Sequence, residues 1–236
     1  MNDGEPYSME IDELEAVSTC CVFFKKGFVE SLYYSFSSSQ TKLLDDPAVS
    51  VQPLSFLSRL HPKSNTLAVL MDEVRNHALA RAPAINVEEL YMQVAHELLL
   101  EYSEVQQQLT RIRAARSSTR AEILRRVSRG REYLHGEAYG DVTLAAAADA
   151  ACMSPFHFHR SFVQAFSRTP AQYVAELRFS KAIQLLKQGT PVTSVCLSVG
   201  FESVSSFSTA FRKRVGISPR ALRPGNFARF DKFPKP

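Results

Sequence analysis

The sequence predicts a mainly α-helical protein: a C-terminal all-α domain with two helix-turn-helix units joined by a long helix, preceded by a helical dimerisation segment and a short β region. Three observations predict this fold. Six residues recur at an offset of 49, apolar residues follow a helical period from residue 64 onward, and basic residues gather in the second half. The repeated pairs are Ser154 with Ser203, Phe158 with Phe207, Phe162 with Phe211, Phe166 with Val215, Thr169 with Ser218, and Pro170 with Pro219.

The net charge of +4 hides an uneven distribution along the 236 residues. Residues 1–110 hold 7 Lys and Arg against 16 Asp and Glu, a net charge of −9, whereas residues 111–236 hold 21 against 8, a net charge of +13. An ordinary solvated surface does not require such a division, and positive charge concentrated in one domain is typical of proteins that bind a polyanion. Double-stranded DNA is therefore the expected partner of the second half.

The four cysteines, at positions 20, 21, 152 and 196, show neither the spacing of metal ligands nor that of a disulfide framework. A reduced, cytoplasmic environment fits this pattern. No basic-then-apolar run opens the sequence, and no apolar run approaches the roughly 20 residues that a membrane helix needs. We expect a soluble cytoplasmic protein with no metal, no cofactor and no membrane partner.

Residues 1–60 are expected to form a partial β region. The segments 17–25 and 28–36 are rich in Val, Phe and Tyr, as strands are, and Lys26-Gly27 between them is typical of a hairpin turn. Two strands are not stable alone in water, so this region needs another layer or a partner chain.

Residues 61–116 are expected to be helical. Apolar positions from Leu67 to Val74 mark one amphipathic helix, and Asn86 is an N-cap candidate for a second. The second helix could pack within its own domain, or it could be a dimerisation helix that forms a homodimer through residues 87–112. Both interpretations rest on apolar residues at near-heptad spacing, which are Val87, Tyr91, Val94, Leu98, Val105, Leu109 and Ile112.

Residues 117–225 are expected to form the basic domain, which starts with a helix after a break at Ser117 and Ser118. Glycines 136 and 140 end this helix. Its apolar face is Ile123, Leu124, Val127 and Leu134. Arginines 120, 125, 126 and 129 surround it, most of them solvated and some of them candidates for phosphate contacts.

Each copy of the repeat predicts a short helix, a tight turn and a second helix. Residues 144–151 and 192–199 are the short helices. Ser154 and Ser203 are N-cap candidates for the second helices, and Pro155 suits the first helical position. Phenylalanines four apart then form an apolar stripe that faces inward, which leaves an outer basic face. This arrangement is a helix-turn-helix.

A long helix from Pro170 to about Lys187 is expected to join the two units. Thr169 and Gln172 form a capping box at its start, and Gly189-Thr190-Pro191 stops it. Its 18 residues span about 27 Å, close to the roughly 34 Å between successive major grooves on one face of DNA. One chain can therefore present two helices to adjacent grooves.

The tract from about Val142 to Arg223 resembles the DNA-binding domain of the AraC/XylS family of bacterial transcription regulators. The motifs that carry the resemblance are residues 153–162 (MSPFHFHRSF), 169–173 (TPAQY), 199–203 (VGFES) with Phe207, Phe211 and Arg212, and 216–219 (GISP).

The resemblance implies a sequence-specific transcription regulator, more commonly an activator, that places two recognition helices near a promoter and acts on RNA polymerase. In many family members a cupin-like β-barrel that binds an effector precedes this domain. Residues 23–24 and 27–29 resemble the last part of such a barrel, so most of the barrel is expected to be absent and a complete small-molecule pocket is in doubt.

The candidate DNA-binding residues are the outward positions of the two second helices: Phe156, His157, His159, Arg160 and Val163, then Val204, Ser205, Ser206, Thr209 and Arg212. By resemblance, the positions of Phe156, His159 and Arg160 enter the groove. Arg160 can pair with guanine, although a plain phosphate contact is the alternative, and Phe156 can contact a thymine methyl. The second helix has shorter side chains, so we expect weaker base readout from it, with phosphate affinity from residues 212–214.

Cys152 stands in the first turn, where the family usually has glycine, and a non-glycine in a left-handed conformation costs about 1–2 kcal/mol.

Two other functions compete with DNA binding as interpretations of the sequence. The chain could be an interaction subunit that forms mixed dimers with a full-length regulator, or an enzyme with a cysteine nucleophile. The enzyme is disfavoured because Cys152 and Cys196 have no base beside them in sequence, so no catalytic residue is expected. Residues 226–236 are expected to be a basic tail.

Overall fold

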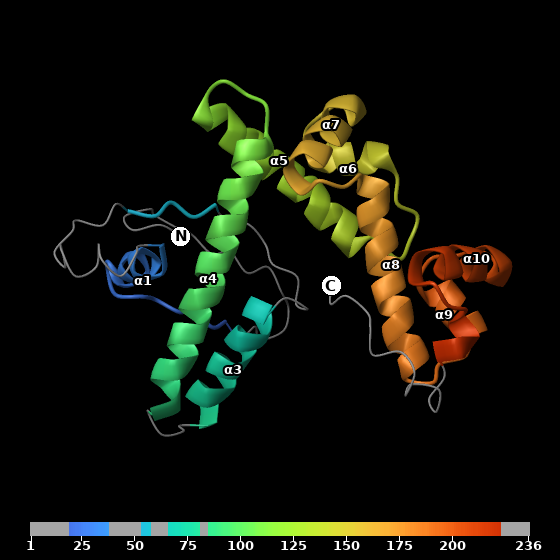
Figure 1. Ribbon diagram of the computed structural model, residues 1–236, viewed down its shortest axis with the longest axis horizontal. Coiled ribbons are helices and arrows are strands. Elements are labelled where there is room, and N and C mark those ends of the chain that lie inside the picture. Colours follow the sequence, from blue (N-terminus) through green and yellow to red (C-terminus); the bar gives the residue numbers. More distant parts are fainter. Residues whose placement is uncertain (1–18, 38–52, 58–65, 81–84, 223–236) are drawn as a thin grey trace. The chain divides into compact units, whose positions relative to one another are not determined.

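The computed structural model describes residues 19–37, 53–57, 66–80 and 85–222. The chain forms two compact units, an N-terminal unit of Met1–Thr110 and a C-terminal unit of Arg111–Pro236. Every regular element among the described residues is a helix, as the ribbon in Figure 1 shows, so the prediction of a mainly helical protein is confirmed. The segments predicted at 1–18 and 226–236 lie outside the described residues.

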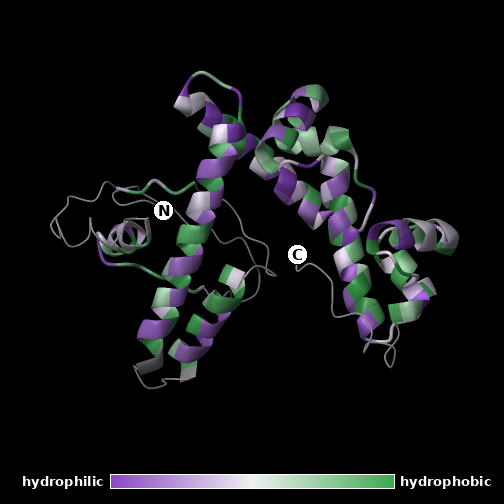
Figure 2. Ribbon diagram, in the orientation of Figure 1, coloured by the Kyte–Doolittle hydropathy of each residue, from purple (hydrophilic) through white to green (hydrophobic). Residues whose placement is uncertain are grey.

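The N-terminal unit contains α1 (Phe28–Ser37), α3 (Thr66–Ala80) and most of α4 (Ile85–Arg111). Its core lies between α3 and α4 and consists of Leu67, Leu70, Val74, Leu90 and Val94. Figure 2 shows the alternation of hydrophobic and hydrophilic residues along these helices, which is the pattern expected when one face of a helix is covered.

The strand predicted at residues 28–36 is wrong, because this segment is the helix α1. Val29, Tyr33 and Phe36 recur at helical spacing, and this period competes with the β-propensity of the aromatic residues. Packing decides between the two: the ring of Tyr33 lies edge-on to Tyr102 of α4, and the ring of Phe36 lies edge-on to His96. Gly27, with φ of 80°, forms the predicted turn, but this turn leads into a helix.

The other predicted strand, residues 17–25, is also wrong where the structure describes it. Residues 19–25 form no ladder, although their side chains alternate. Cys20, Val22 and Phe24 pack against the core of the N-terminal unit, whereas Cys21 and Phe23 are exposed. The alternation therefore reflects an extended segment lying on helices. The resemblance to the end of a cupin-like barrel has no strand to support it in the described residues.

The helix α4 begins at Ile85, one residue before the predicted cap. Of the predicted seam, Val94 is 1% exposed within the core of a single chain, and Leu98 packs against the same core. Burial of these residues favours the first of the two interpretations, a helix packed within its own unit. Pairing of two chains through residues 87–112 stays a prediction.

In its described residues, 111–222, the C-terminal unit contains six α-helices and a short 3₁₀ helix. The helix α5 (Ser117–Gly136) precedes the first helix pair, α6 (Leu144–Ala150) and α7 (Pro155–Phe166). The long helix α8 (Pro170–Lys187) leads to the second pair, α9 (Val192–Ser198) and α10 (Val204–Val215), and η1 (Pro219–Leu222) closes the unit. The predicted order of two helix pairs joined by a long helix is confirmed.

The predicted N-caps of the long helix and of the two repeated helices are confirmed. The Ser154 hydroxyl accepts from the backbone N–H of His157, and the Ser203 hydroxyl accepts from that of Ser206. At α8, Thr169 and Gln172 satisfy each other's backbone N–H groups, at 2.8 and 3.1 Å, in a full capping box. These caps fix where each helix begins.

Candidate nucleic-acid interface

The two repeated helices, α7 and α10, are both 12 residues long, and they start at an offset of 49. Their phenylalanines face inward as predicted. Phe158 and Phe162 of α7 and Phe207 and Phe211 of α10 are all 0% exposed. Stripes four residues apart thus fix the rotation of each helix about its own axis, and with it the set of side chains that faces outward.

The outward face of α7 carries the side chains that the sequence singles out. Phe156 is 78% exposed, a high value for a phenylalanine, and it lies in the first turn of the helix. His157, His159 and Arg160 are exposed, and Val163 is half-buried. An exposed apolar ring beside a guanidinium at a helix N-terminus offers both apolar contact and bidentate hydrogen bonding, the two modes of reading base edges.

The outward face of α10 carries smaller side chains than that of α7. Val204 is 38% exposed, and Ser205, Thr209 and Arg212 are exposed. The Ser206 hydroxyl lies 2.8 Å from the Ser203 hydroxyl and so takes part in the N-cap cluster. With short side chains along this face, α10 has fewer groups able to reach base edges than α7.

The turn of the first helix-turn-helix unit, between α6 and α7, contains Cys152, whose φ of 52° is left-handed. Its backbone N–H donates to Asp149, and the N–H of Met153 donates to Ala148, which closes α6 with a Schellman motif. Gly200 in the second helix-turn-helix unit has φ of 76°, its N–H donates to Leu197, and the N–H of Phe201 donates to Cys196, so the same motif closes α9. A non-glycine residue in this turn leads us to expect either a strained or a differently shaped turn, and the φ of Cys152 shows the left-handed, strained form.

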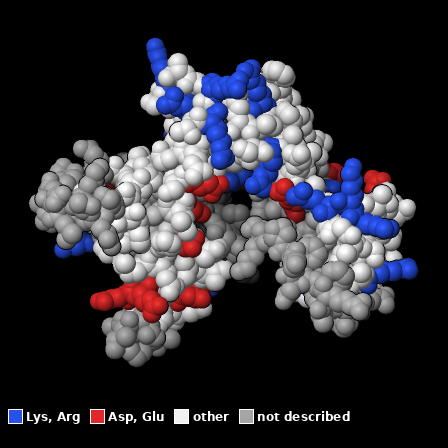
Figure 3. Space-filling model, in the orientation of Figure 1, with Lys and Arg blue, Asp and Glu red and all other residues white. Residues whose placement is uncertain are grey.

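Basic side chains gather on the C-terminal unit. Figure 3 shows Lys and Arg gathered over the C-terminal unit in this view, with some Asp and Glu among them, and a further cluster of Asp and Glu over the N-terminal unit. Some of these cations are already paired. Arg125 and Arg126 both bind Glu122, and the hydrogen bond from Arg126 is the main cause of the lowered pKa of that carboxyl. Arg214 binds Glu176 at 3.0 Å, so of residues 212–214 it is the one with a carboxylate partner in the described part of the chain.

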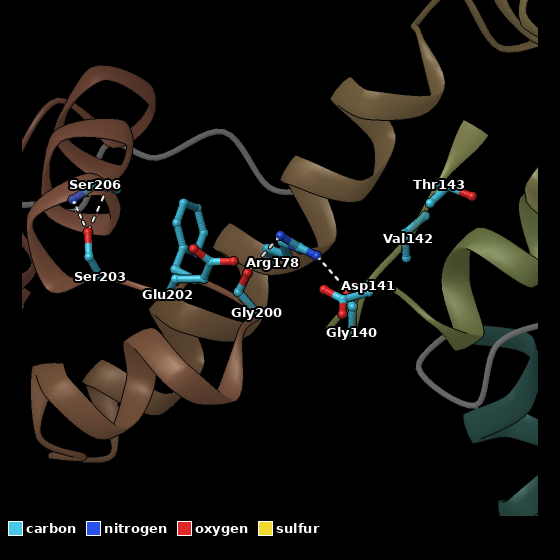
Figure 4. A pocket seen from close by; sticks show the side chains of 10 residues that line it. Gly140, Asp141, Val142, Thr143, Arg178, Gly200, Glu202, Ser203 and Ser206 are labelled. Atoms are coloured by element: carbon cyan, nitrogen blue, oxygen red, sulfur yellow. Dashed lines mark hydrogen bonds between the residues drawn. The ribbon is translucent and has the colours of Figure 1, made fainter. Parts of the chain in front are cut away.

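A cavity of about 580 Å³ lies between the two helix pairs. Figure 4 shows Arg178 of α8 reaching between the loop after α5 and the turn before α10. Its guanidinium donates to three backbone carbonyl oxygens: Ala138 at 2.7 Å, Gly140 at 2.7 Å and Gly200 at 2.9 Å. The cavity is lined by Gly140, Asp141, Val142, Thr143, Arg178, Gly200, Phe201, Glu202, Ser203 and Ser206.

The sequence interpretation missed Arg178 and Glu176. No local pattern marks Arg178, because its acceptors at Ala138, Gly140 and Gly200 lie in two loops distant from it in sequence. Glu176 accepts from Arg168 of the segment after α7 and from Arg214 of α10. Its role depends on residues distant in sequence, so no local pattern marks it.

Cys196, one of the two cysteines of the C-terminal unit, is poorly suited to act as a nucleophile. Cys196 is buried, its thiol lies 3.5 Å from the carbonyl oxygen of Phe201, and burial raises its pKa, which disfavours the thiolate. In the described ranges, no three His, Cys, Asp or Glu side chains are grouped as a metal ion would require. No helix in these ranges is long and apolar enough to cross a membrane.

Comparison with known proteins matches residues 147–224 to a family described as a helix-turn-helix domain. The chain is 39% identical over 88 residues to the HTH-type transcriptional activator RhaS of Escherichia fergusonii, covering 37% of this chain and 32% of RhaS. It is 39% identical over 77 residues to the HTH-type transcriptional regulator ArgR of Pseudomonas aeruginosa, covering 32% of this chain and 23% of ArgR. The chain thus spans a third or less of the length of these two relatives.

Two further proteins are similar over the same region. The bifunctional transcriptional activator/DNA repair enzyme Ada of Escherichia coli is 34% identical over 84 residues, covering 36% of this chain and 24% of Ada. Among solved structures, the C-terminal domain of AraT, a response regulator from Geobacillus stearothermophilus, is 28% identical with a TM-score of 0.40, covering 45% of this chain and 93% of that domain. Together with the motifs at the two turns, the sequence matches identify residues 147–224 as a helix-turn-helix domain of the AraC type.

Proposed function

We propose that this protein regulates transcription by binding double-stranded DNA in a sequence-specific manner, with α7 and α10 in adjacent major grooves. The observation that carries the proposal is the repeated geometry of the two helices. Both are 12 residues long, both are capped by a serine, and both fully bury two phenylalanines four residues apart and expose the opposite face. A helix that presents its N-terminal side chains in this way fits the major groove.

Base readout is assigned chiefly to α7. Arg160 supplies a bidentate donor, Phe156 an apolar contact and His159 a single hydrogen bond, all from exposed positions. The remaining outward positions, His157 and Val163, flank these three. For α10 we assign a smaller contribution from Val204, Ser205, Ser206 and Thr209, with Arg212 on the phosphate backbone.

The relatives RhaS and Ada are named as transcriptional activators. By this similarity we propose activation, with RNA polymerase as the further partner. The opposite outcome, repression by obstruction of the promoter, uses the same DNA-binding surface and differs only in where the bound site lies.

A binding titration with two variants tests the proposal. Arg160→Ala should weaken binding to a preferred sequence and leave binding to unrelated duplexes almost unchanged, whereas Arg212→Ala should weaken binding to all sequences and reduce the salt slope by about one. Fluorescence anisotropy over a series of salt concentrations measures both quantities. Equal loss on every sequence for both variants would argue against base readout by α7.

A further inference from the structure

The side chain of Arg178 joins the two helix-turn-helix units at the middle of the helix that separates them. It is the ninth of the 18 residues of α8. Two of its three hydrogen bonds go to the loop between α5 and α6, at Ala138 and Gly140, and one goes to the turn between α9 and α10, at Gly200. Figure 4 shows the guanidinium between these loops.

The chemistry of this contact depends on arginine. A guanidinium is a planar fork with five donors, so it can bind carbonyl oxygens that lie in different directions at the same time. Lysine has the same charge, but its donors radiate from a single atom on a flexible stem. The Arg178 guanidinium also lies 5.9 Å from the ring centroid of Phe201. That ring contacts Phe179 and Phe207, which belong to the hydrophobic core formed by α8, α9 and α10.

The contact of Arg178 with the loop at 138–140 and the turn at Gly200 forms a joint between the two helix-turn-helix units, and the backbone at this joint is tightly packed. A Cβ added at Gly200 would lie 2.7 Å from the carbonyl oxygen of Tyr139 and 3.0 Å from Arg178 Cζ, and the φ of 76° already favours glycine. The turn between α9 and α10 therefore packs directly against the loop between α5 and α6. Three residues after Gly200, Ser203 caps α10, so the position of this turn determines where the second recognition helix begins.

The other polar connections between the two helix-turn-helix units are weaker, while α8 also packs through Tyr173 against Phe162 and through Phe179 against Phe211. The chain itself connects them through short segments at the two ends of α8. Glu176 adds ion pairs to Arg168 and Arg214, whose side chains are 46% and 58% exposed. Exposed ion pairs of this kind contribute little and are screened by salt. Arg178, with three hydrogen bonds of which those to Ala138 and Gly200 are partly buried, is better placed to fix one helix-turn-helix unit against the other.

We propose that Arg178 is a positioning residue that sets the relative rotation of the two recognition helices, and so determines which spacing between the two DNA blocks the protein accepts. This inference rests on the proposed function, in which both helices read DNA. Each base pair inserted between the blocks rotates the second block by about 34° and moves it by about 3.4 Å. A rigid joint cannot follow such a change, whereas a loosened joint can.

The test uses the full chain and duplexes that carry the two preferred blocks at the selected spacing, or with one or two base pairs added or removed between them. Dissociation constants are measured by fluorescence anisotropy at one salt concentration for the wild type, Arg178→Lys and Lys181→Gln. Arg178→Lys keeps the charge and removes the fork. Lys181→Gln removes a charge from the same helix without touching the joint, and controls for electrostatics.

We expect the wild type to lose about tenfold or more in affinity for each base pair of displacement, the scale of a mismatched base pair. Arg178→Lys should bind the first block alone within about twofold of the wild type, bind the selected spacing about tenfold more weakly, and show a flattened dependence on spacing. Lys181→Gln should keep the wild-type dependence on spacing. A residue with a merely structural role would lower affinity equally at every spacing.

Two results would overturn the inference: a folded Arg178→Lys protein with the wild-type spacing profile, or one whose affinity falls uniformly at all spacings. If Arg178→Lys does not fold, as judged by circular dichroism, Gly200→Ala decides, because it disturbs the same joint and keeps the guanidinium. A flattened profile for Gly200→Ala supports the inference, and a wild-type profile rejects it. A wild type that prefers no two-block site would instead reject the proposed function itself.

Discussion

Cys152 and Gly200 occupy the same place in the two helix-turn-helix units. Each is the left-handed residue that ends a seven-residue helix, with φ of 52° and 76°, and each donates its N–H to a carbonyl three residues earlier. Two positions separate Cys152 from the serine cap of α7, and three separate Gly200 from that of α10. Cys152 and Gly200 are therefore 48 positions apart, whereas the helices that follow them start 49 positions apart. Both residues have the left-handed conformation, but only the second helix-turn-helix unit has a glycine there, the residue that adopts this conformation without strain.

Replacement of Cys152 by glycine is expected to stabilise the C-terminal unit. Relief of the left-handed strain is worth about 1–2 kcal/mol, and the greater entropy of unfolded glycine offsets about 0.5–1 kcal/mol of it. We expect a net gain near 0.5–1 kcal/mol in the free energy of unfolding, measured by urea denaturation. Cys152→Ser keeps the strain and removes the thiol, so it should show no gain. A gain as large for serine as for glycine would assign the effect to the thiol.

Gly130 lies where α5 meets the first recognition helix. A Cβ added there would lie 2.2 Å from Cε2 of Phe158 and 2.9 Å from the carbonyl oxygen of Ala147. Gly130→Ala should therefore destabilise the unit by about 1–3 kcal/mol, despite the better helix propensity of alanine. Gly136→Ala is the matched control, because no atom lies within 4 Å of its added Cβ, and it should be neutral or slightly stabilising. Similar urea midpoints for the two variants would contradict this packing.

The capping box at the start of α8 provides a third prediction. Thr169→Ala removes the acceptor for the N–H of Gln172 and should lower the free energy of unfolding by about 1 kcal/mol. Thr169→Ser keeps the hydroxyl and should behave like the wild type. If thermal denaturation showed the serine and alanine variants to be equally destabilised, the threonine methyl group, rather than the hydrogen bond, would be the stabilising feature.

The stability of the C-terminal unit should depend on pH through His135. Its Nδ1 lies 3.1 Å from the hydroxyl of Tyr173, and burial, with a smaller contribution from the charge of Arg131, lowers its pKa below the usual 6.5. Because the unfolded chain then binds the proton more readily, stability is unaffected above pH 6.5 and falls as the pH drops below it. One such group changes stability by at most about 1.4 kcal/mol per pH unit.

Urea titrations at several pH values between neutrality and pH 5 measure this dependence. His135→Gln should reduce the loss of stability at low pH relative to the wild type. Tyr173→Phe removes the hydrogen bond and leaves the nearby charge, so it should retain most of the pH dependence. An unchanged pH profile in His135→Gln would show that other groups titrate in this range.

The C-terminal unit could be predicted closely from the sequence because its signals are local. Ser154, Ser203 and Thr169 are caps whose partners lie three residues away, and phenylalanines four apart mark the buried face without reference to any other element. Even the left-handed conformation of Cys152 follows from its place after a short helix. Periodicity and caps together determine where α7, α8 and α10 begin and which face each buries.

Contacts between distant residues could not be predicted in the same way. Residues 28–36 have strong β-propensity, and the rings of Tyr102 and His96, at least 60 residues away from the rings they contact, favour the helix. Arg178 likewise finds its acceptors 40 residues before it and 22 residues after it, in two loops with no sequence signature. Neither contact is encoded in the spacing of nearby residues.

Selection of bound sites from a pool of random duplexes, at a stated salt concentration, tests the central claim most directly when the intact chain is compared with Arg160→Ala. We expect two blocks about one helical turn apart, one sharply defined and read by α7 and one less defined and read by α10, with the substitution relaxing only the sharp block. Binding that is equally tight to every sequence, and that Arg160→Ala merely weakens, would contradict it.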